Sequence, residues 1–199
     1  MQKESLLIKF RNKTLPALCV LLLCIPVEAS ANAGVPMIFL VMPALGFSLI
    51  PIVIIEAIYL SKKLELTLAS AAKTVTISNV VSTLVGIPLT WFLLVLVQML
   101  VGGGGAFGLD TTLGKIMSVT LQAAWLIPYE ADLQWMIPVA GLVLLVPFFF
   151  VSWWSEYLVS KKMLKSHPAQ TIKAQVRNAN IITYVLLAFW PVGFWVFNN

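Results

Sequence analysis

Long apolar runs separated by short polar segments dominate this sequence. Four of the runs are long enough, or nearly so, to cross the ~30 Å hydrocarbon core of a bilayer as helices of about 20 residues. These runs cover residues 35–60, 75–101, 135–159 and 179–197. The pattern predicts an all-α integral membrane protein with four transmembrane helices, arranged as two similar hairpins.

The first 33 residues have the pattern of a secretory signal peptide. A basic segment, MQKESLLIKFRNK, precedes an apolar core, LPALCVLLLCIPV, and a tail of small residues, EASANAG. Cleavage after Ala31 or after Ala33 fits the small-residue rule, and an uncleaved signal anchor is the alternative. Both cysteines, Cys19 and Cys24, lie inside this segment. A cleaved chain would therefore have no disulfide and no cysteine metal site.

The polar segments divide the rest of the chain into three parts. The segment between the hairpins opens with GGGGAFG, a run that cannot hold a stable helix, and continues with an apolar stretch at 113–129. We expect that stretch to be an interfacial or re-entrant helix, with a fifth span as the less favoured alternative. The predicted parts are a first transmembrane hairpin at 34–101, an extracytoplasmic linker at 102–134 and a second hairpin at 135–199.

The basic residues predict the sidedness of the helices. The segments 61–74 and 160–178 together carry eight lysines and arginines, whereas the central linker carries one. Because cytoplasmic loops are enriched in these residues, both segments are expected in the cytoplasm. The prediction is a multi-pass protein of the bacterial inner membrane whose mature N- and C-termini are extracytoplasmic. The lysines that mark the cytoplasmic helix ends are Lys62, Lys63, Lys161 and Lys162.

Composition agrees with a membrane protein and excludes several functional classes. Hydrophobic residues make up 60% of the chain and charged residues only 11%, against about 25% in soluble domains. The net charge of +5 comes from the N-terminus and the two lysine segments, which is a topology signal and indicates no nucleic-acid partner. The chain has one histidine and no nucleophile, nucleotide or zinc motif. We therefore expect no metal, no cofactor and no catalytic residue.

The two hairpins share a short sequence pattern. IIEAIYLSKK at 54–63 and WWSEYLVSKK at 153–162 both place an acid shortly before Ser-Lys-Lys. Glu56 and Glu156 are 100 residues apart, and Asn79 and Asn178 are 99 apart. The offsets suggest a parallel internal repeat. Convergence is the alternative, because many cytoplasmic helix ends carry lysines.

Glu56 and Glu156 are the candidate functional residues, because an acid at the bilayer centre costs ~2.5–3.5 kcal/mol. One interpretation pairs each with a lysine at its own helix end, Lys63 or Lys162. The other turns each acid inward, toward polar side chains of the neighbouring helix. We expect a polar intramembrane network with two halves, in which Glu56 meets Asn79 and Ser82, and Glu156 meets Asn180 and Tyr184.

Small residues recur every four positions along the second apolar run. Such a spacing places them on one face of a helix, where a second backbone can approach closely. The sequence therefore predicts a helix-packing ridge, whose first member also joins the polar network. The ridge consists of Ser78, Ser82, Gly86 and Thr90.

The segment IPIVIIEAIYLSKKLELTLASAAKTVTISNVVSTLVG, at 50–86, resembles the cyanobacterial filament-integrity (FraC) family. FFFVSWWSEYLVSKK and NANIITYVLL are similar to the Glu-bearing helix and the Asn–Ser–Tyr span of that family. The signal segment, the GGGG linker and residues 113–129 depart from it. The resemblance implies a structural role at cell–cell contacts or in placing other membrane proteins. The positions it carries over are Glu56, Asn79, Ser82, Glu156, Asn180 and Tyr184.

Three functions fit the sequence to different degrees. The first is a non-enzymatic membrane protein that assembles envelope or cell–cell-contact partners within the lipid bilayer, including other membrane proteins or copies of itself. The alternative is a small oligomeric transporter or channel that uses Glu56 and Glu156. The third, an intramembrane enzyme, has the same two acids as its sole candidate acid pair.

Overall fold

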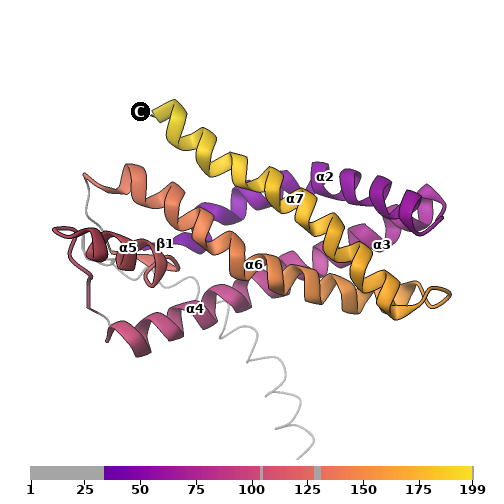
Figure 1. Cartoon of the computed structure of the whole chain (residues 1–199), viewed down its shortest axis with the longest axis horizontal. Coiled ribbons are helices and arrows are strands. Elements are labelled where there is room, and N and C mark those ends of the chain that lie inside the picture. The colour runs from indigo at the N-terminus through magenta and orange to yellow at the C-terminus, as the bar shows by residue number, and fades with distance from the viewer. Residues whose placement is uncertain (1–33, 104, 128–130, 199) are drawn as a thin grey trace, which may run out of the picture. The chain divides into compact units, whose positions relative to one another are not determined.

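The computed structural model describes residues 34–103, 105–127 and 131–198, so the predicted signal peptide lies outside the described residues. Within these ranges the chain is mostly helical (Figure 1). In order, the elements are β1 (Val35–Pro36), α2 (Met37–Lys63), α3 (Leu68–Val81), the π-helix η1 (Ser82–Gly86), α4 (Ile87–Gly102), α5 (Thr112–Thr120), β2 (Trp125–Leu126), α6 (Leu133–Met163) and α7 (Ala169–Asn198).

Three helices among the described residues are long and apolar enough to cross a membrane. They are α2, the continuous helix Leu68–Gly102 that joins α3, η1 and α4, and α6. The second helix and α6 contain the predicted spans 75–101 and 135–159, and α2 covers the predicted span 35–60 except for its first two residues, which form β1. The fourth predicted span, 179–197, lies within the single helix α7, which is not one of the three. The described chain is therefore mostly helical, with three helices that could cross a membrane by their length and composition.

The polar segments within each hairpin are much shorter than predicted. Helix α2 continues to Lys63 and α3 begins at Leu68; α6 continues to Met163 and α7 begins at Ala169. Only residues 64–67 and 164–168 remain as turns. The predicted limits of 61–74 and 160–178 were wrong because they followed the apolar residues, whereas the backbone stays helical where its side chains become polar.

Local interactions explain where these helices end. The hydroxyl of Thr67 accepts a hydrogen bond from the backbone N–H of Ser70, which caps the start of α3. Lysines occupy the last turns of α2 and α6, where their charge is favourable at the negative end of the helix dipole. All four of these lysines, Lys62, Lys63, Lys161 and Lys162, are exposed.

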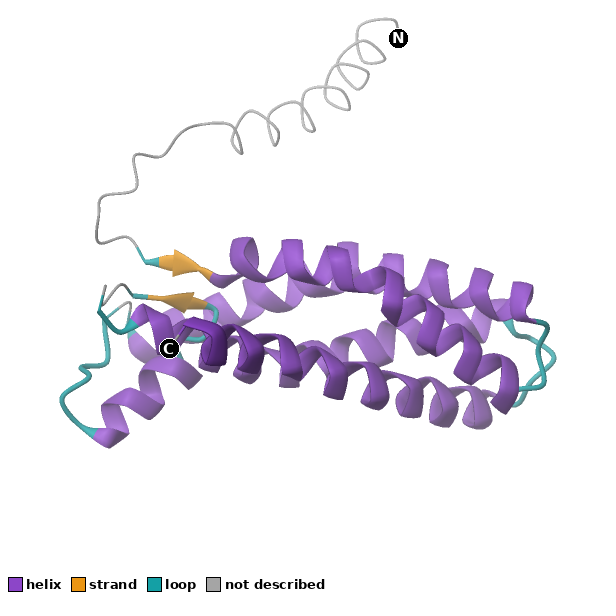
Figure 2. Cartoon of the chain, turned by 90° about the horizontal axis from the view of Figure 1, so that it is seen from above, coloured by secondary structure: helices purple, strands orange, loops and turns teal. Residues whose placement is uncertain are grey.

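The two turns lie at the same end of the helices and are in contact. Figure 2 shows both turns at one end and the two strands at the other. Nε2 of His167 in the second turn lies 2.9 Å from the carbonyl oxygen of Leu64 in the first. Since a carbonyl oxygen can only accept, the imidazole donates this bond from Nε2. The histidine thus joins the two hairpins, a role that no sequence signal indicated.

The linker differs from its predicted form. Helix α5 ends at Thr120, and a turn leads into β2, which pairs antiparallel with β1. The indole Nε1 of Trp91 donates to the carbonyl of Ala124 at 2.7 Å, and Nε2 of Gln98 donates to that of Trp125 at 2.8 Å. A helix through residue 129 was therefore wrong beyond Thr120, because α4 and β1 provide the hydrogen bonds of the segment after it. The two-stranded sheet also departs from the all-α prediction.

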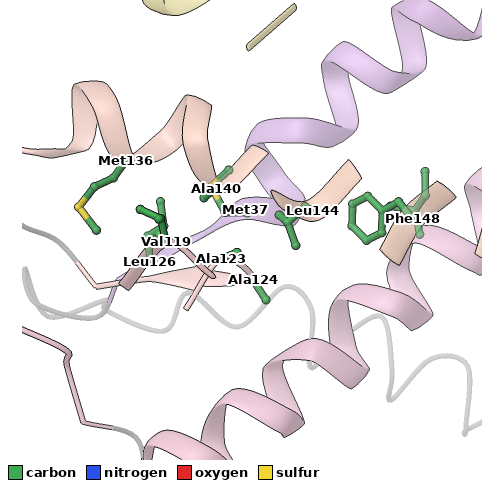
Figure 3. Close-up of a cluster of buried hydrophobic side chains, with 10 residues drawn as sticks. Met37, Val119, Ala123, Ala124, Leu126, Met136, Ala140, Leu144 and Phe148 are labelled. Carbon is green, nitrogen blue, oxygen red and sulfur yellow. The ribbon is translucent and has the colours of Figure 1, made fainter. Parts of the chain in front are cut away.

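Buried apolar side chains form two clusters at opposite ends of the helices. One lies near the turns and consists of Ala57, Leu60, Leu64, Val75, Leu164, Ile172 and Val176. The other joins α6 to α5 and the strands (Figure 3); its members include Met37, Val119, Leu126, Met136, Leu144 and Phe148. The polar residues predicted as functional lie along the helices between these clusters, so a buried polar layer interrupts the apolar core.

The helix Leu68–Gly102 contains a π-helical turn at Ser82–Gly86, shortly before Pro88. Proline lacks an N–H, and its ring clashes with the carbonyl four residues earlier in a regular α-helix. A wider turn relieves this conflict, and such turns are frequent at functional sites. Ser82, one of the predicted network residues, opens this turn.

Candidate functional site

Glu56 and Glu156 occupy equivalent depths in their helices. Each lies seven residues before the end of its helix (63 − 56 and 163 − 156), which is about 10 Å along the axis at 1.5 Å per residue. Their side chains are only 2% and 3% exposed. Both acids therefore point into the protein, at one level below the lysine-bearing helix ends.

Glu56 bonds to residues of both hairpins. Nδ2 of Asn79 donates to Oε2 of Glu56 at 2.8 Å, from the helix that follows within the same hairpin. The hydroxyl of Thr183, on α7 of the other hairpin, lies 2.8 Å from Oε1. The carboxyl group thus connects α2, α3 and α7.

Glu156 repeats this arrangement with the hairpins exchanged. Nδ2 of Asn180 donates to Oε2 of Glu156 at 2.7 Å, again from the following helix of the same hairpin. The hydroxyl of Ser82, on the first hairpin, lies 3.0 Å from Oε1. Each acid thus receives an amide from its own hairpin and a hydroxyl from the other. We call Glu56, Asn79, Ser82, Glu156, Asn180 and Thr183 the carboxyl network.

Each asparagine is held in a fixed orientation. Nδ2 of Asn79 also donates to the carbonyl of Val75, and Nδ2 of Asn180 to that of Val176, both at 3.1 Å. A backbone carbonyl can only accept, so in both residues the NH₂ group faces the carbonyl and the carboxyl group together. The amides are therefore donors to the acids.

The numbering of the network follows an internal repeat. The acids are 100 residues apart, whereas Asn79 and Asn180, like Ser82 and Thr183, are 101 apart. The first turn has four residues, 64–67, and the second has five, 164–168. The additional turn residue accounts for the change of offset, so the two halves of the network are equivalent positions of two similar hairpins.

A small cavity lies between the two acids. Its volume is about 20 Å³, enough for about one water molecule, and the carboxyl network lines it together with Ser152 and Tyr184. No lysine, arginine or histidine is among the described residues that line it. Oδ1 of Asn180 is buried and accepts no hydrogen bond from the described part of the chain.

The structure brings together most of the predicted network but changes its pairing. The contact between Glu56 and Asn79 and the one between Glu156 and Asn180 are confirmed. Ser82 was expected beside Glu56 and bonds to Glu156 instead. Ser82 lies one helical turn after Asn79 and faces α6, which carries Glu156.

Tyr184 and Ser78 lie beside the network, and their hydroxyl groups bond to other residues than the acids. The hydroxyl of Tyr184 donates to Oγ of Ser152 at 2.8 Å, so its expected bond to Glu156 was wrong. Ser78 is buried but bonds to the carbonyl of Val75 within its own helix. The match of Asn79 with Asn178 was also wrong, since Asn180 is the equivalent residue.

The alternative pairing of the acids with Lys63 and Lys162 is absent. Both lysines are exposed, whereas both carboxyl groups are buried and bonded to amides and hydroxyls. The predicted network did not include Thr183 or Ser152. With an offset of 101 residues, Ser82 corresponds to Thr183. The offset of 99 used in the prediction did not reveal this correspondence.

The predicted packing ridge is buried along its whole length, at Ser78, Ser82, Gly86 and Thr90. A Cβ added to Gly86 would lie 3.0 Å from Cγ1 of Val151, so α6 approaches this backbone closely. The hydroxyl of Thr90 donates to the carbonyl of Gly86 at 2.7 Å and stays outside the carboxyl network.

The chemistry available at the network is that of oxygen ligands. Within the described ranges, no group of three or more His, Cys, Asp or Glu side chains is placed to hold a metal ion. The two carboxyl groups, surrounded by neutral donors, can bind a proton or a small cation. The cavity is too small for an organic substrate between them.

No family model, no curated protein and no solved structure matches this chain. The resemblance to the FraC family therefore stays a prediction from sequence.

Proposed function

We propose that this chain is a small, non-enzymatic membrane protein that binds an ion at the carboxyl network and serves as a subunit of an oligomeric transporter or channel. One observation carries the proposal: two buried acids share a cavity that no basic side chain of the described residues lines. Burying an uncompensated charge is strongly unfavourable. A bound proton or cation is the simplest compensation.

The position of the network supports movement of this ion. Transporters built from internal repeats place coupling ions at the interface between repeats. Here each acid bonds across that interface, to Thr183 or to Ser82. A change in ion occupancy would therefore act directly on the contacts that join the two hairpins.

The proposed arrangement in the membrane has four spans, with α7 as the fourth, in the bacterial inner membrane. The lysine-bearing turns lie in the cytoplasm, a signal peptide precedes the first span, and the mature termini are extracytoplasmic. Reporter fusions test this sidedness. A cytoplasmic reporter should be active at the turns 64–67 and 164–168 and inactive within 105–111; the opposite pattern would refute the arrangement.

Ion movement is tested with the purified chain in lipid vesicles. Glu56→Gln and Glu156→Gln each remove one acid and keep its size, and each should abolish flux of protons or alkali cations driven by a gradient. Glu65→Gln is the matched control, because Glu65 is an exposed acid in the first turn. Equal flux in all variants, or none in the unchanged chain, would contradict the proposal.

The second candidate is a scaffold that assembles envelope or cell–cell-contact proteins. The bonds between Ser82 and Glu156 and between Thr183 and Glu56 support it, because they fasten the hairpins around a cavity of about one water. A scaffold predicts a stoichiometric membrane partner or homo-oligomer after extraction in mild detergent. Recovery of a partner without any flux would favour the scaffold over the transporter.

A further inference from the structure

Each of the two hydroxyl groups of the carboxyl network has one hydrogen but lies within hydrogen-bond distance of more than one acceptor. Oγ of Ser82 lies 3.0 Å from Oε1 of Glu156 and 3.0 Å from the carbonyl of Asn79. A hydroxyl has one hydrogen, which it can give to only one acceptor at a time. Ser82 must therefore choose between the acid of the other hairpin and the backbone of its own helix.

Thr183 faces the same choice. Its Oγ1 lies 2.8 Å from Oε1 of Glu56, and 3.3 Å and 3.2 Å from the carbonyls of Ala179 and Asn180. In both halves the acceptor that competes with the acid is a backbone carbonyl of the helix that carries the hydroxyl. The two halves thus share one arrangement, although their hydroxyl residues differ.

This geometry suits two protonation states of each acid. When the acid is ionised, the hydroxyl donates to Oε1, and the backbone carbonyl gives up this bond. When the acid is protonated on Oε1, the new O–H donates to the hydroxyl oxygen. The hydroxyl then gives its hydrogen to the backbone carbonyl, so every hydrogen has an acceptor and no heavy atom has to move.

The asparagines decide which oxygen takes the proton. Nδ2 of Asn79 and Nδ2 of Asn180 each donate to Oε2 of their acid, and their second acceptor, a backbone carbonyl, keeps them in that orientation. A proton on Oε2 would oppose an N–H. The oxygen next to the hydroxyl, Oε1, is therefore the protonation site.

We propose that the ion bound by this protein is the proton, held on Oε1 of Glu56 and of Glu156, and that Ser82 and Thr183 reverse their hydrogen bonds as it binds and leaves. The inference rests on the proposed function and names its ion. Each uptake forms one O–H bond and neutralises one carboxylate, so two protons remove both charges and no counter-ion is required.

The other described groups at the cavity agree with a proton rather than a metal ion. All four carboxyl oxygens already face N–H or O–H groups, which a cation would have to displace. Of the described titratable side chains, α2 contributes Glu56, α6 contributes Glu156 and α7 contributes Tyr184, while α3 and η1 contribute none. Tyr184 is occupied with Ser152.

Infrared difference spectroscopy of the full chain in lipid vesicles tests the inference. Lowering the pH should produce the C=O band of a protonated, buried carboxyl, and Glu56→Gln and Glu156→Gln should each remove part of it. Thr183→Val should shift the frequency of the component lost in Glu56→Gln, and Ser82→Ala that of Glu156. Thr183→Ser should restore the original frequency, since it keeps the hydroxyl.

Thr90→Val is the matched control, because Thr90 is a buried hydroxyl that bonds only within its own helix; the carboxyl band should not change. The inference is overturned if the folded chain shows no such band at any pH, if the band ignores both hydroxyl substitutions, or if sodium ions at constant pH suppress it. Flux without the band would refute the proton as the bound ion and leave the proposed transport function intact. The band without flux would refute the transporter and leave the proton site intact.

Discussion

The two hairpins contribute matching residues to the carboxyl network and surround them differently. Ser82 of the first hairpin opens a π-helical turn, whereas Thr183 of the second lies in a continuous α-helix. Behind the second half, Tyr184 bonds to Ser152. The corresponding positions of the first half, Thr83 and Ile52, form no such pair. Both halves thus have the same acid, amide and hydroxyl groups, but the residues and backbone that surround these groups differ.

This difference indicates that the two acids are chemically related but not interchangeable. Oδ1 of Asn180 is buried and has no donor among the described residues, whereas Oδ1 of Asn79 is not such a buried, unpartnered atom. An unsatisfied buried acceptor is unfavourable and can accept a hydrogen bond from an additional water molecule. We therefore expect the Glu156 half of the network to change its hydrogen bonds more readily than the Glu56 half.

The largest effect is expected from removing an acid. Glu56→Ala and Glu156→Ala each leave one amide N–H without its acceptor, while the hydroxyl keeps the backbone carbonyl of its own helix. The free energy of unfolding should fall by about 1–3 kcal/mol. Reversible unfolding by SDS in mixed micelles measures this loss. Because the acids share a cavity, the double variant should lose less than the sum of the single losses.

Glu65→Ala is the control for this comparison, since an exposed acid should change stability by no more than about 0.5 kcal/mol. A gain in stability on removing either buried acid would show that the acids repel each other as charges. That result would contradict neutralisation by bound protons.

A smaller effect separates the asparagines. Asn79→Ala removes a satisfied donor and should cost about 1–2 kcal/mol, because the carboxyl oxygen loses its partner. Asn180→Ala removes the same donor together with an unpartnered oxygen, so it should cost less. The same unfolding measurement distinguishes them. Equal losses would mean that Oδ1 of Asn180 has a partner in the membrane, such as a water molecule.

The sequence predicted the helices better than their ends. Apolar runs locate membrane helices because the bilayer requires about 20 such residues. They do not mark where a helix stops, since Lys62, Lys63 and Lys73 continue helical structure outside the apolar region. Burial of Glu56, Asn79, Glu156 and Asn180 was predictable, because polar side chains within apolar runs need partners.

The crossing of the network between the hairpins was not predictable in the same way. Sequence spacing places Ser82 one turn from Asn79, and nothing local determines which of two acids its hydroxyl meets. That choice depends on how the first hairpin packs against α6. The one-residue difference between the turns further concealed that Thr183 corresponds to Ser82.

The smallest predicted effect tests the support behind the second half. Tyr184→Phe removes only the hydroxyl that donates to Ser152, and an interhelical hydrogen bond in a membrane is worth about 0.6 kcal/mol on average. Thr83→Val changes the corresponding position of the first half, where the described chain forms no such bond, and should be nearly neutral. Unfolding in mixed micelles again gives the stabilities, and the infrared band of Glu156 gives a second reading. If the Tyr184–Ser152 pair holds α7 against α6 at the level of the acid, Tyr184→Phe will alter that band and leave the band of Glu56 unchanged. Equal changes in both bands would mean that the asymmetry of the two hairpins has no effect at the acids.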